Sequence, residues 1–148
     1  MRLVVQRVSR AAVRVRGQTV ARIGPGLLVL VGVGQADGGP AEAQRLAGKV
    51  FGLRIFEDSE GKMNRSLSEV GGQILVVPQF TLYGDARQGR RPSWARAAPP
   101  DVARDRVAYF ARALEELGAS VERGAFQEHM EVELVNDGPV TILLEGET

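Results

Sequence analysis

Apolar and polar residues alternate through the first 23 positions, as they do in strands that bury one face. The apolar members of this alternation are Val4, Val13, Val15, Val20 and Ile23. The polar stretch Arg16-Gly17-Gln18 divides them into two runs, which predicts a β-hairpin. An unbroken apolar run follows at residues 27–33 and predicts a buried strand.

Two later segments place apolar residues at helical spacing. The first begins at Pro40, and its apolar face comprises Ala43, Leu46, Ala47, Val50 and Phe51. The second begins at Asp101, a candidate N-cap, and ends at Gly118. Residues 53–56 and 73–77 predict two further strands between these helices.

The C-terminal part reads EVELVNDGPVTILLE at residues 131–145. Two apolar runs flank Asn136-Asp137-Gly138, which predicts two strands joined by a hairpin turn. Pro139 fits such a turn poorly, because it has no N–H to give to a strand ladder. The isomer of the Gly138–Pro139 bond stays open at this point. The whole pattern predicts one α+β domain, residues 1–148, of mostly antiparallel sheets with two main helices on one side.

Composition narrows the classes of function. Hydrophobic residues make up 44% and charged residues 25% of the 148 residues, the balance of an ordinary globular domain. There is no cysteine, and His129 is the only histidine, so disulfides, thiolate chemistry and multi-histidine metal centres are excluded. Gly32-Val33-Gly34 lacks the third glycine of a dinucleotide-binding loop. We expect a cytoplasmic protein with no membrane segment.

Residues 78–82, PQFTL, form the first candidate site. A proline at the end of a buried strand interrupts ladder pairing, so the amides that follow are free to hold a carbonyl oxygen as an oxyanion hole does. The plainer alternative is a strand end with a capping threonine. Thr81 is a weak nucleophile by itself, since neither histidine nor lysine lies near it in sequence.

An arginine-rich loop at residues 87–96 is the second candidate. Four arginines surround Trp94, with Tyr83 upstream and only Asp85 opposing their charge. Guanidinium groups bind phosphates and aromatic rings stack on bases, so a single-stranded nucleic acid end is a suitable partner. A solvated loop without a ligand is the alternative.

Taken together, five segments resemble the D-aminoacyl-tRNA deacylase family over essentially the whole chain. They are VQRV at residues 5–8, GKMN at 61–64, PQFTL at 78–82, RPS at 91–93 and NDGPVT at 136–141. The resemblance implies a homodimeric hydrolase that cleaves the ester between tRNA and a D-amino acid, or glycine mischarged on tRNA-Ala, with no cofactor and no metal. Such an ester is already activated, so we expect main-chain amides around Phe80 and Thr81 as the oxyanion hole and the ribose 2′-OH of the substrate as the base, with a Thr81 nucleophile as the second choice.

The resemblance also implies roles for individual residues. Gly138-Pro139 is expected to be cis and to reach into the partner's pocket, where its carbonyls exclude L-amino acids, and Arg7 is expected to hold that loop in place. The full set comprises Gln79, Phe80 and Thr81 for catalysis, Gly138, Pro139, Arg7, Pro78, Met130 and Asn136 for substrate binding and L-rejection, and Arg87, Arg90 and Arg91 for tRNA. Pro78 stands where the family usually has serine. A sister group of tRNA deacylases that tolerates L-alanine resembles this chain at Pro78-Gln79 but differs at Phe80, so Phe80 and the NDGPVT motif favour D-specificity. A non-catalytic nucleic-acid-binding module remains the rival from another class.

Overall fold

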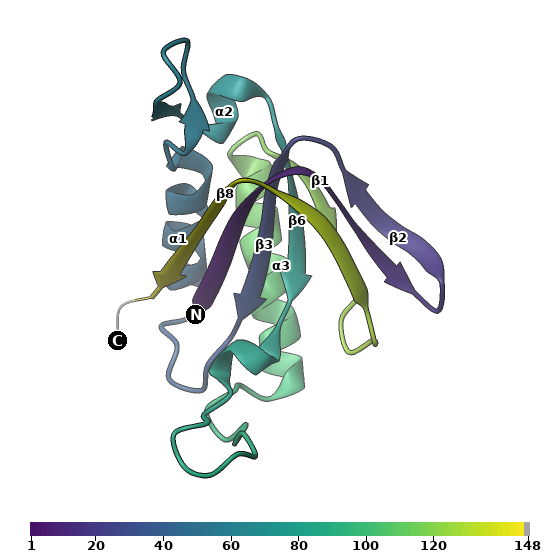
Figure 1. Cartoon of the computed structure of the whole chain (residues 1–148). Helices are drawn as coiled ribbons and strands as arrows, with labels where there is room; N and C mark the ends of the chain where they lie inside the picture. Colours follow the sequence, from purple (N-terminus) through teal and green to yellow (C-terminus); the bar gives the residue numbers. More distant parts are fainter. Residues whose placement is uncertain (147–148) are drawn as a thin grey trace.

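The computed structural model describes residues 1–146 as a six-stranded mixed sheet with its two long helices on one face (Figure 1). The strand order is β2-β1-β3-β6-β7, and β8 pairs with β1 outside this path. The strands of the sheet are β1 (Arg2–Val15), β2 (Gln18–Ile23), β3 (Gly26–Gly32), β6 (Gln73–Pro78), β7 (Ser120–Arg123) and β8 (Glu131–Glu145). The helices α1 (Pro40–Gly52) and α3 (Pro100–Glu116) are the two main helices that the periodicity predicted.

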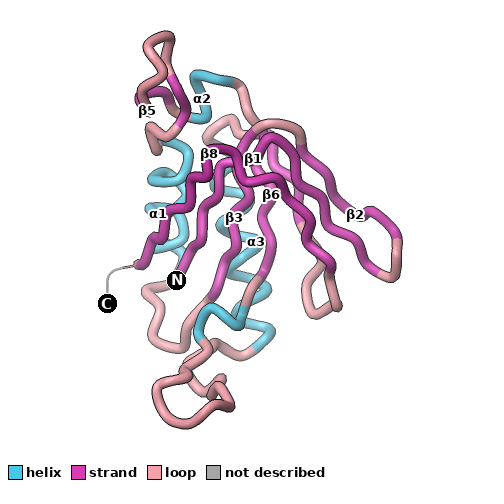
Figure 2. Tube along the Cα trace, in the orientation of Figure 1, coloured by secondary structure: helices cyan, strands magenta, loops and turns pink. Residues whose placement is uncertain are grey.

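Three short elements complete the fold (Figure 2). They are the two-stranded sheet of β4 (Phe56–Glu57) and β5 (Met63–Arg65), the helix α2 (Leu67–Val70) and the 3-10 helix η1 (Phe80–Tyr83). The strand expected at residues 53–56 is therefore shifted toward Phe56–Glu57, where it pairs with β5. No helix among residues 1–146 is long and apolar enough to cross a membrane.

The predicted α+β class is confirmed, with one feature that local pattern did not indicate. β1 pairs antiparallel with β2, β3 and β8, whereas β3, β6 and β7 run parallel. Parallel neighbours need long crossovers, and the segments that contain α1 and α3 provide them. The two helices therefore lie together over one face of the sheet.

The central strands β3 and β6 are buried on both faces. Under α1 and α3, the larger cluster includes Leu27, Leu46 and Phe110, each at most 2% exposed. On the opposite face, Val13, Leu28 and Leu75 belong to a second cluster beneath the curled ends of β1, β2 and β8. Burying one such apolar side chain contributes roughly 1.5–3 kcal/mol, so both clusters stabilise the sheet.

The alternation of buried side chains along β1 shifts from one face of the sheet to the other at the middle of the strand. Leu3 and Val5 point into the cluster under the helices, while Val8 and Val13 belong to the opposite cluster. The buried positions therefore shift by one residue between Arg7 and Val8, where the pairing with β8 is also irregular.

The hairpin predicted at residues 131–145 is wrong. β8 is one strand of 15 residues that pairs with β1 along its length. Its register passes from Thr141 opposite Gln6 to Asn136 opposite Val8, so residues 137–140 leave the ladder as a bulge. A bulge lets a strand carry Pro139 without losing a ladder hydrogen bond.

The start of α3 also differs from the prediction. Pro99 occupies the N-cap position and Pro100 follows it, a position where proline is favoured because its missing N–H has no helical partner. Asp101 therefore lies in the first turn, where its negative charge interacts favourably with the positive end of the helix dipole.

Candidate active site

The PQFTL segment links the end of β6 to η1. The Gln79 N–H donates to the Val31 carbonyl at 2.8 Å, so the ladder extends one residue beyond Pro78, further than predicted. η1 then begins at Phe80, and the first N–H groups of a helix have no partner within it. Among residues 1–146 the Phe80 and Thr81 N–H groups donate to no acceptor. Two adjacent amides are thus available to a ligand.

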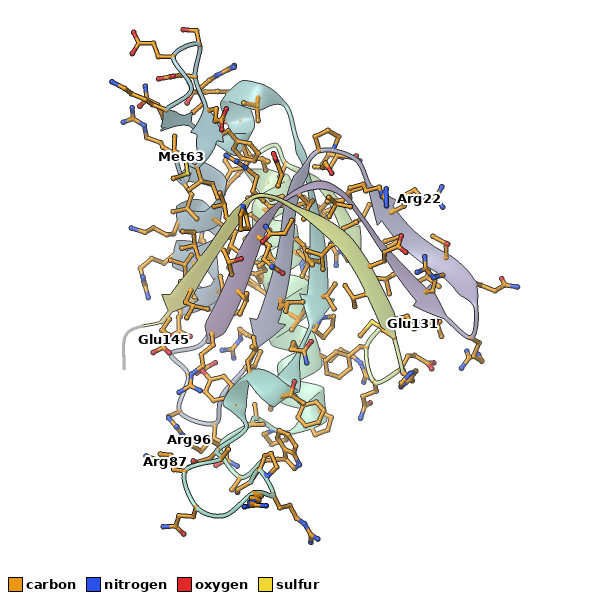
Figure 3. The ribbon with its side chains drawn as sticks, in the orientation of Figure 1. Arg22, Met63, Arg87, Arg96, Glu131 and Glu145 are labelled. Carbon is orange, nitrogen blue, oxygen red and sulfur yellow. The ribbon has the colours of Figure 1, made fainter. Side chains whose placement is uncertain are left out.

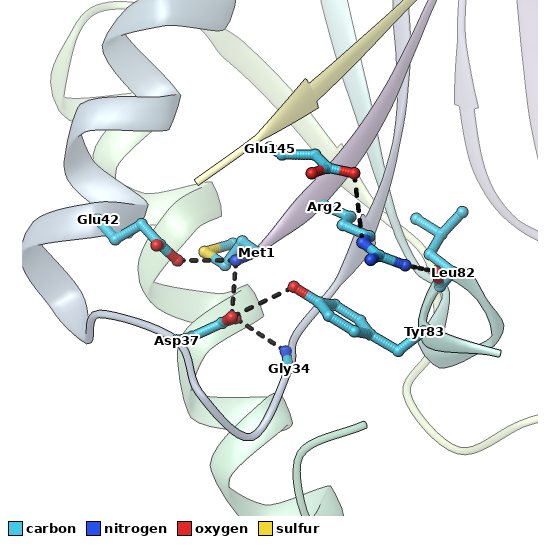
Figure 4. Close-up of polar contacts among 8 residues, drawn as sticks. All are labelled: Met1, Arg2, Gly34, Asp37, Glu42, Leu82, Tyr83 and Glu145. Atoms are coloured by element: carbon cyan, nitrogen blue, oxygen red, sulfur yellow. Dashed lines mark hydrogen bonds and ion pairs between the residues drawn. The ribbon is translucent and has the colours of Figure 1, made fainter. Parts of the chain in front are cut away.

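η1 is anchored from two sides (Figure 4). The Leu82 carbonyl accepts a hydrogen bond from Arg2 Nη1 at 2.9 Å, and the Arg2 guanidinium lies 4.6 Å from the centre of the Tyr83 ring. The Tyr83 hydroxyl donates to Asp37 at 3.2 Å. Burial, together with the Asp37 carboxylate, raises the pKa of Tyr83 well above its usual range. These contacts hold the last residues of η1 and so orient the free amides at its start.

Asp37 is itself held by several donors. Its second carboxylate oxygen accepts the Gly34 N–H at 2.8 Å, and the Met1 ammonium lies 2.8 Å from Asp37 and 2.8 Å from Glu42. A carboxylate fixed by an ammonium and a backbone N–H is a firm acceptor for Tyr83.

Gly32 and Gly34 allow η1 to approach the sheet. A Cβ at Gly34 would come within 2.6 Å of the Tyr83 ring, and one at Gly32 within 2.9 Å of Leu82 Cβ. Both distances are shorter than real Cβ contacts. The Gly32-Val33-Gly34 sequence thus accommodates η1.

A cavity of about 600 Å³ opens beside the free amides. Its walls come from β3 and the end of β6, from the segment leading into α3, and from the loop before β8. The wall residues include Val31, Pro78, Gln79, Phe80, Ala98, Ala103, Val107, Phe126, His129 and Met130. The lining is mostly apolar, with Gln79, Gln127, Glu128 and His129 as its polar members, a composition that suits an aromatic or nucleoside-like group.

Thr81 follows Phe80 but does not line the cavity, and its hydroxyl has no general base beside it within the described residues. Its hydroxyl accepts a hydrogen bond from the Gln79 side-chain amide. Among residues 1–146, no histidine, lysine or carboxylate makes a hydrogen bond to that hydroxyl. An activated nucleophile needs such a base. Among residues 1–146 the local geometry thus supplies no base that would activate the Thr81 hydroxyl.

The second group of predicted residues gathers at the bulge of β8. Arg7 is buried, and its guanidinium donates to the carbonyls of Ile55 at 2.7 Å and Asp137 at 3.1 Å. The side-chain amide of Asn136 donates to the carbonyls of Arg7 at 2.9 Å and Val140 at 3.0 Å. The start of the bulge is thus tied to β1, and the Asn136 side chain joins its two ends.

The tip of the bulge is exposed to solvent. The Gly138–Pro139 bond is cis, and both residues are exposed. Neither residue lines the cavity, which does contain Met130 from the start of the same segment. The structure therefore places Pro78, Gln79, Phe80 and Met130 together, and Arg7, Asn136, Gly138 and Pro139 together elsewhere.

The arginine loop lies at the opposite end of the sheet from the arch of β8 (Figures 1 and 3). Arg87 is bound to Asp85 through two charge-assisted hydrogen bonds of 2.9 and 2.6 Å. These bonds hold the pKa of the Asp85 carboxyl well below its usual range. Arg90 and Arg91 form no ion pair with any carboxylate in the described part of the chain. Of the three predicted tRNA-binding arginines, two are available and one holds the loop together.

Sequence reasoning missed several residues of the site. Arg2 and Asp37 gave no signal, because their contacts with η1 join segments 80 and 46 residues apart. Phe126 and Ala103 form cavity walls only through tertiary packing. Tyr83 was considered as a stacking residue for nucleic acid, yet it is buried against Arg2 and Asp37.

A cavity beside two free main-chain amides is an arrangement that acyl-ester hydrolases use. The family model described as D-Tyr-tRNA(Tyr) deacylase matches residues 4–145. A D-aminoacyl-tRNA deacylase of Symbiobacterium thermophilum is 60% identical over 99% of this chain and 97% of its own length. One of Heliobacterium modesticaldum is 58% identical over the same shares.

This chain belongs to the D-aminoacyl-tRNA deacylase family, whose members hydrolyse the ester bond of aminoacyl-tRNA. A solved structure named c-Myc DNA Unwinding Element Binding Protein is also similar. Its TM-score is 0.94 at 36% identity, with both chains fully covered. The family resemblance inferred from the five sequence segments is thus confirmed.

Proposed function

We propose that this chain releases D-amino acids, and glycine mischarged on tRNA-Ala, from the 3′-terminal adenosine of tRNA in the cytoplasm. It acts as a homodimer that rejects L-amino acids. The observation that carries the proposal is the pair of free amides at Phe80 and Thr81 beside an apolar cavity of about 600 Å³. That cavity suits the terminal adenosine, and the amides suit the oxyanion formed at the ester carbon.

The chemistry requires little of the side chains. A water molecule attacks the ester carbonyl, and the Phe80 and Thr81 amides hold the resulting oxyanion. The neighbouring ribose 2′-OH relays the proton of the water to the departing 3′-oxygen as the ester C–O bond breaks. An aminoacyl ester is already activated, so positioning and charge stabilisation are sufficient. Thr81 as a nucleophile is the second choice, since its hydroxyl has no base beside it.

Selection against L-amino acids is assigned to the bulge of a partner chain. Within one chain the exposed Gly138–Pro139 bulge does not line the cavity, and Arg7 holds it through the Asp137 carbonyl. A two-fold dimer would supply each cavity with the bulge of the other chain. A rigid wall of main-chain carbonyls would clash with any L side chain, and glycine would pass. A pocket that reads side chains would gain only about 1–3 kcal/mol per methylene.

Four substrates test the activity. D-Tyr-tRNA and Gly-tRNA should lose their amino acid, whereas L-Tyr-tRNA and L-Ala-tRNA should stay intact. Release from L-Ala-tRNA would instead assign the sister activity that Pro78 suggests. If all four substrates keep their amino acid and the chain still binds RNA, the result would favour the non-catalytic nucleic-acid-binding function. The name of the 36% identical structure, a DNA-binding protein, suggests that function.

Mixing two variants tests the cross-subunit site. Phe80→Pro removes one free N–H at a helix position that accepts proline. Gly138→Ala places a Cβ 3.0 Å from Arg7 Nη2 and 2.8 Å from Val140 in a bulge with φ of 126°. A mixed dimer then contains one site with both defects and one with none, so mixing two weak variants should restore activity. No recovery after subunit exchange would place the cavity and the bulge of one chain in the same site.

A further inference from the structure

Phe80 and Trp94 lie side by side on the surface. Their side chains are 57% and 43% exposed, and their ring centres are 5.3 Å apart at an interplanar angle of 69°. Large aromatic side chains are mostly buried, so an exposed pair in mutual contact indicates a binding surface. No contact within the described residues requires the Phe80 and Trp94 rings to be exposed to solvent.

The loop that carries Trp94 is held in place. Asp85 and Ser93 exchange two backbone hydrogen bonds of 2.8 Å, and the Gln35 N–H donates to the Arg96 carbonyl at 2.9 Å. The Trp94 ring packs on Gly84, where a Cβ would come within 2.6 Å of the ring. The aromatic pair is therefore positioned before any ligand binds, which lowers the cost of binding.

The charge around the pair selects the ligand. Asp85, the carboxylate of this loop, is neutralised by Arg87, whereas Arg90 and Arg91 have no carboxylate partner in the described residues. A ligand that offers both a flat π-face and negative charge fits this surface, and single-stranded RNA offers both.

The surface is continuous with the active site through Phe80. The Phe80 side chain borders the cavity, and its N–H is one of the two free amides. A strand whose terminal nucleoside occupies the cavity can therefore leave it past Phe80. The nucleotide that precedes the terminal one then lies against Trp94.

We propose that Phe80 and Trp94 form a stacking platform for the unpaired base that precedes the acylated terminal adenosine, with Arg90 and Arg91 on the adjoining phosphates. The assignment rests on the proposed function, because that function places the terminal adenosine in the cavity. It gives the enzyme a second hold on its substrate, independent of the amino acid.

Trp94 is the only tryptophan of the chain, so its fluorescence reports stacking directly. A CCA trinucleotide, the 3′ end that tRNAs share, should quench this fluorescence. The same trinucleotide with an abasic middle position should bind about 5- to 100-fold more weakly, the range that losing one base–aromatic stack produces. Equal binding of the two oligonucleotides would overturn the platform, whatever the chain does to D-aminoacyl-tRNA.

Kinetics with two substrates provides the second test. Trp94→Ala should raise KM for D-Tyr-tRNA at least about fivefold more than KM for 3′-D-tyrosyl-adenosine, which has no preceding nucleotide. Trp94→Phe should restore most of the loss, and Leu117→Ala, which removes a distant exposed side chain, should change neither KM. An equal effect of Trp94→Ala on both substrates would refute the platform. A parent chain that hydrolyses neither substrate would refute the proposed function instead.

Discussion

Replacing Arg7 by methionine tests the link between β1 and the bulge. The substitution removes two hydrogen bonds from a buried guanidinium to the carbonyls of Ile55 and Asp137. Hydrogen bonds of a charged group contribute about 1.5–3 kcal/mol each, and the desolvation of the charge offsets part of that sum. The ion pair with the exposed Asp137 carboxylate adds about 0–1 kcal/mol. We expect the free energy of unfolding to fall by about 2–4 kcal/mol.

Urea unfolding followed by circular dichroism measures this change. With a denaturant slope of about 2 kcal/mol/M, the midpoint should fall by about 1–2 M at equal protein concentration. Arg10→Met is the matched control, because Arg10 lies exposed on the same strand. Arg7→Lys should fall between the parent and Arg7→Met, since one ammonium cannot reproduce the planar fork.

Activity gives the second measurement for Arg7. If Arg7 positions the bulge, Arg7→Met should alter the ratio of D-Tyr-tRNA to L-Tyr-tRNA hydrolysis at temperatures where the variant is folded. The reasoning fails if Arg7→Met matches Arg10→Met within about 0.5 kcal/mol. It also fails if the D-to-L ratio stays at the parent value.

Three further predictions follow from the site. Thr81→Ala should keep substantial D-Tyr-tRNA hydrolysis in single-turnover assays; complete loss would make Thr81 the nucleophile. Asp85→Asn should free Arg87 to bind a phosphate. The slope of log binding constant against log salt concentration should then steepen by about 0.7, the amount for one phosphate contact on a single strand. An unchanged slope would remove Arg87 and this loop from the RNA-binding surface. Tyr83→Phe should cost about 1 kcal/mol of stability at pH 7, measured by urea unfolding. Because the pKa of Tyr83 is raised in the folded chain, the parent should lose stability as pH rises above about 10, and the deficit of Tyr83→Phe should shrink there; a constant deficit would contradict this.

Sequence pattern predicted those parts of the fold that local burial decides. Both long helices and the apolar strands β3 and β6 were found because each buries a periodic or continuous set of residues. β7 was not found, since Ser120–Arg123 has one apolar residue and is defined by its parallel pairing with β6. β8 was divided in two, because Pro139 is incompatible with a regular ladder and a bulge leaves little trace in sequence.

The candidate site was predictable only where its residues are close in sequence. Free amides around Phe80 and Thr81 were expected from PQFTL, and these two N–H groups have no acceptor among residues 1–146, whereas the Gln79 N–H extends the ladder by bonding to Val31. The cavity walls from α3 and the anchoring of η1 by Arg2 and Asp37 depend on contacts between distant segments. Arg7 was predicted from the family resemblance alone. The hydrogen bonds that its guanidinium donates to the carbonyls of Ile55 and Asp137 now give the physical reason for its role.

β1 connects the two halves of the proposed site. Its Arg2 holds the end of η1, and its Arg7 holds the bulge of β8. At roughly 3.3 Å per residue, these two arginines are about 17 Å apart along one strand. In the proposed dimer, the bulge of one chain reaches the cavity of the other. The distance between the carbonyls of the bulge and the free amides is then set by two copies of β1 and by the rotation that relates the two chains. The chain would then discriminate handedness through the rigidity of a sheet, because a loop free to move could yield to an L side chain. The change of faces between Arg7 and Val8 is consistent with this role, since it lets a buried arginine reach the bulge from within the core.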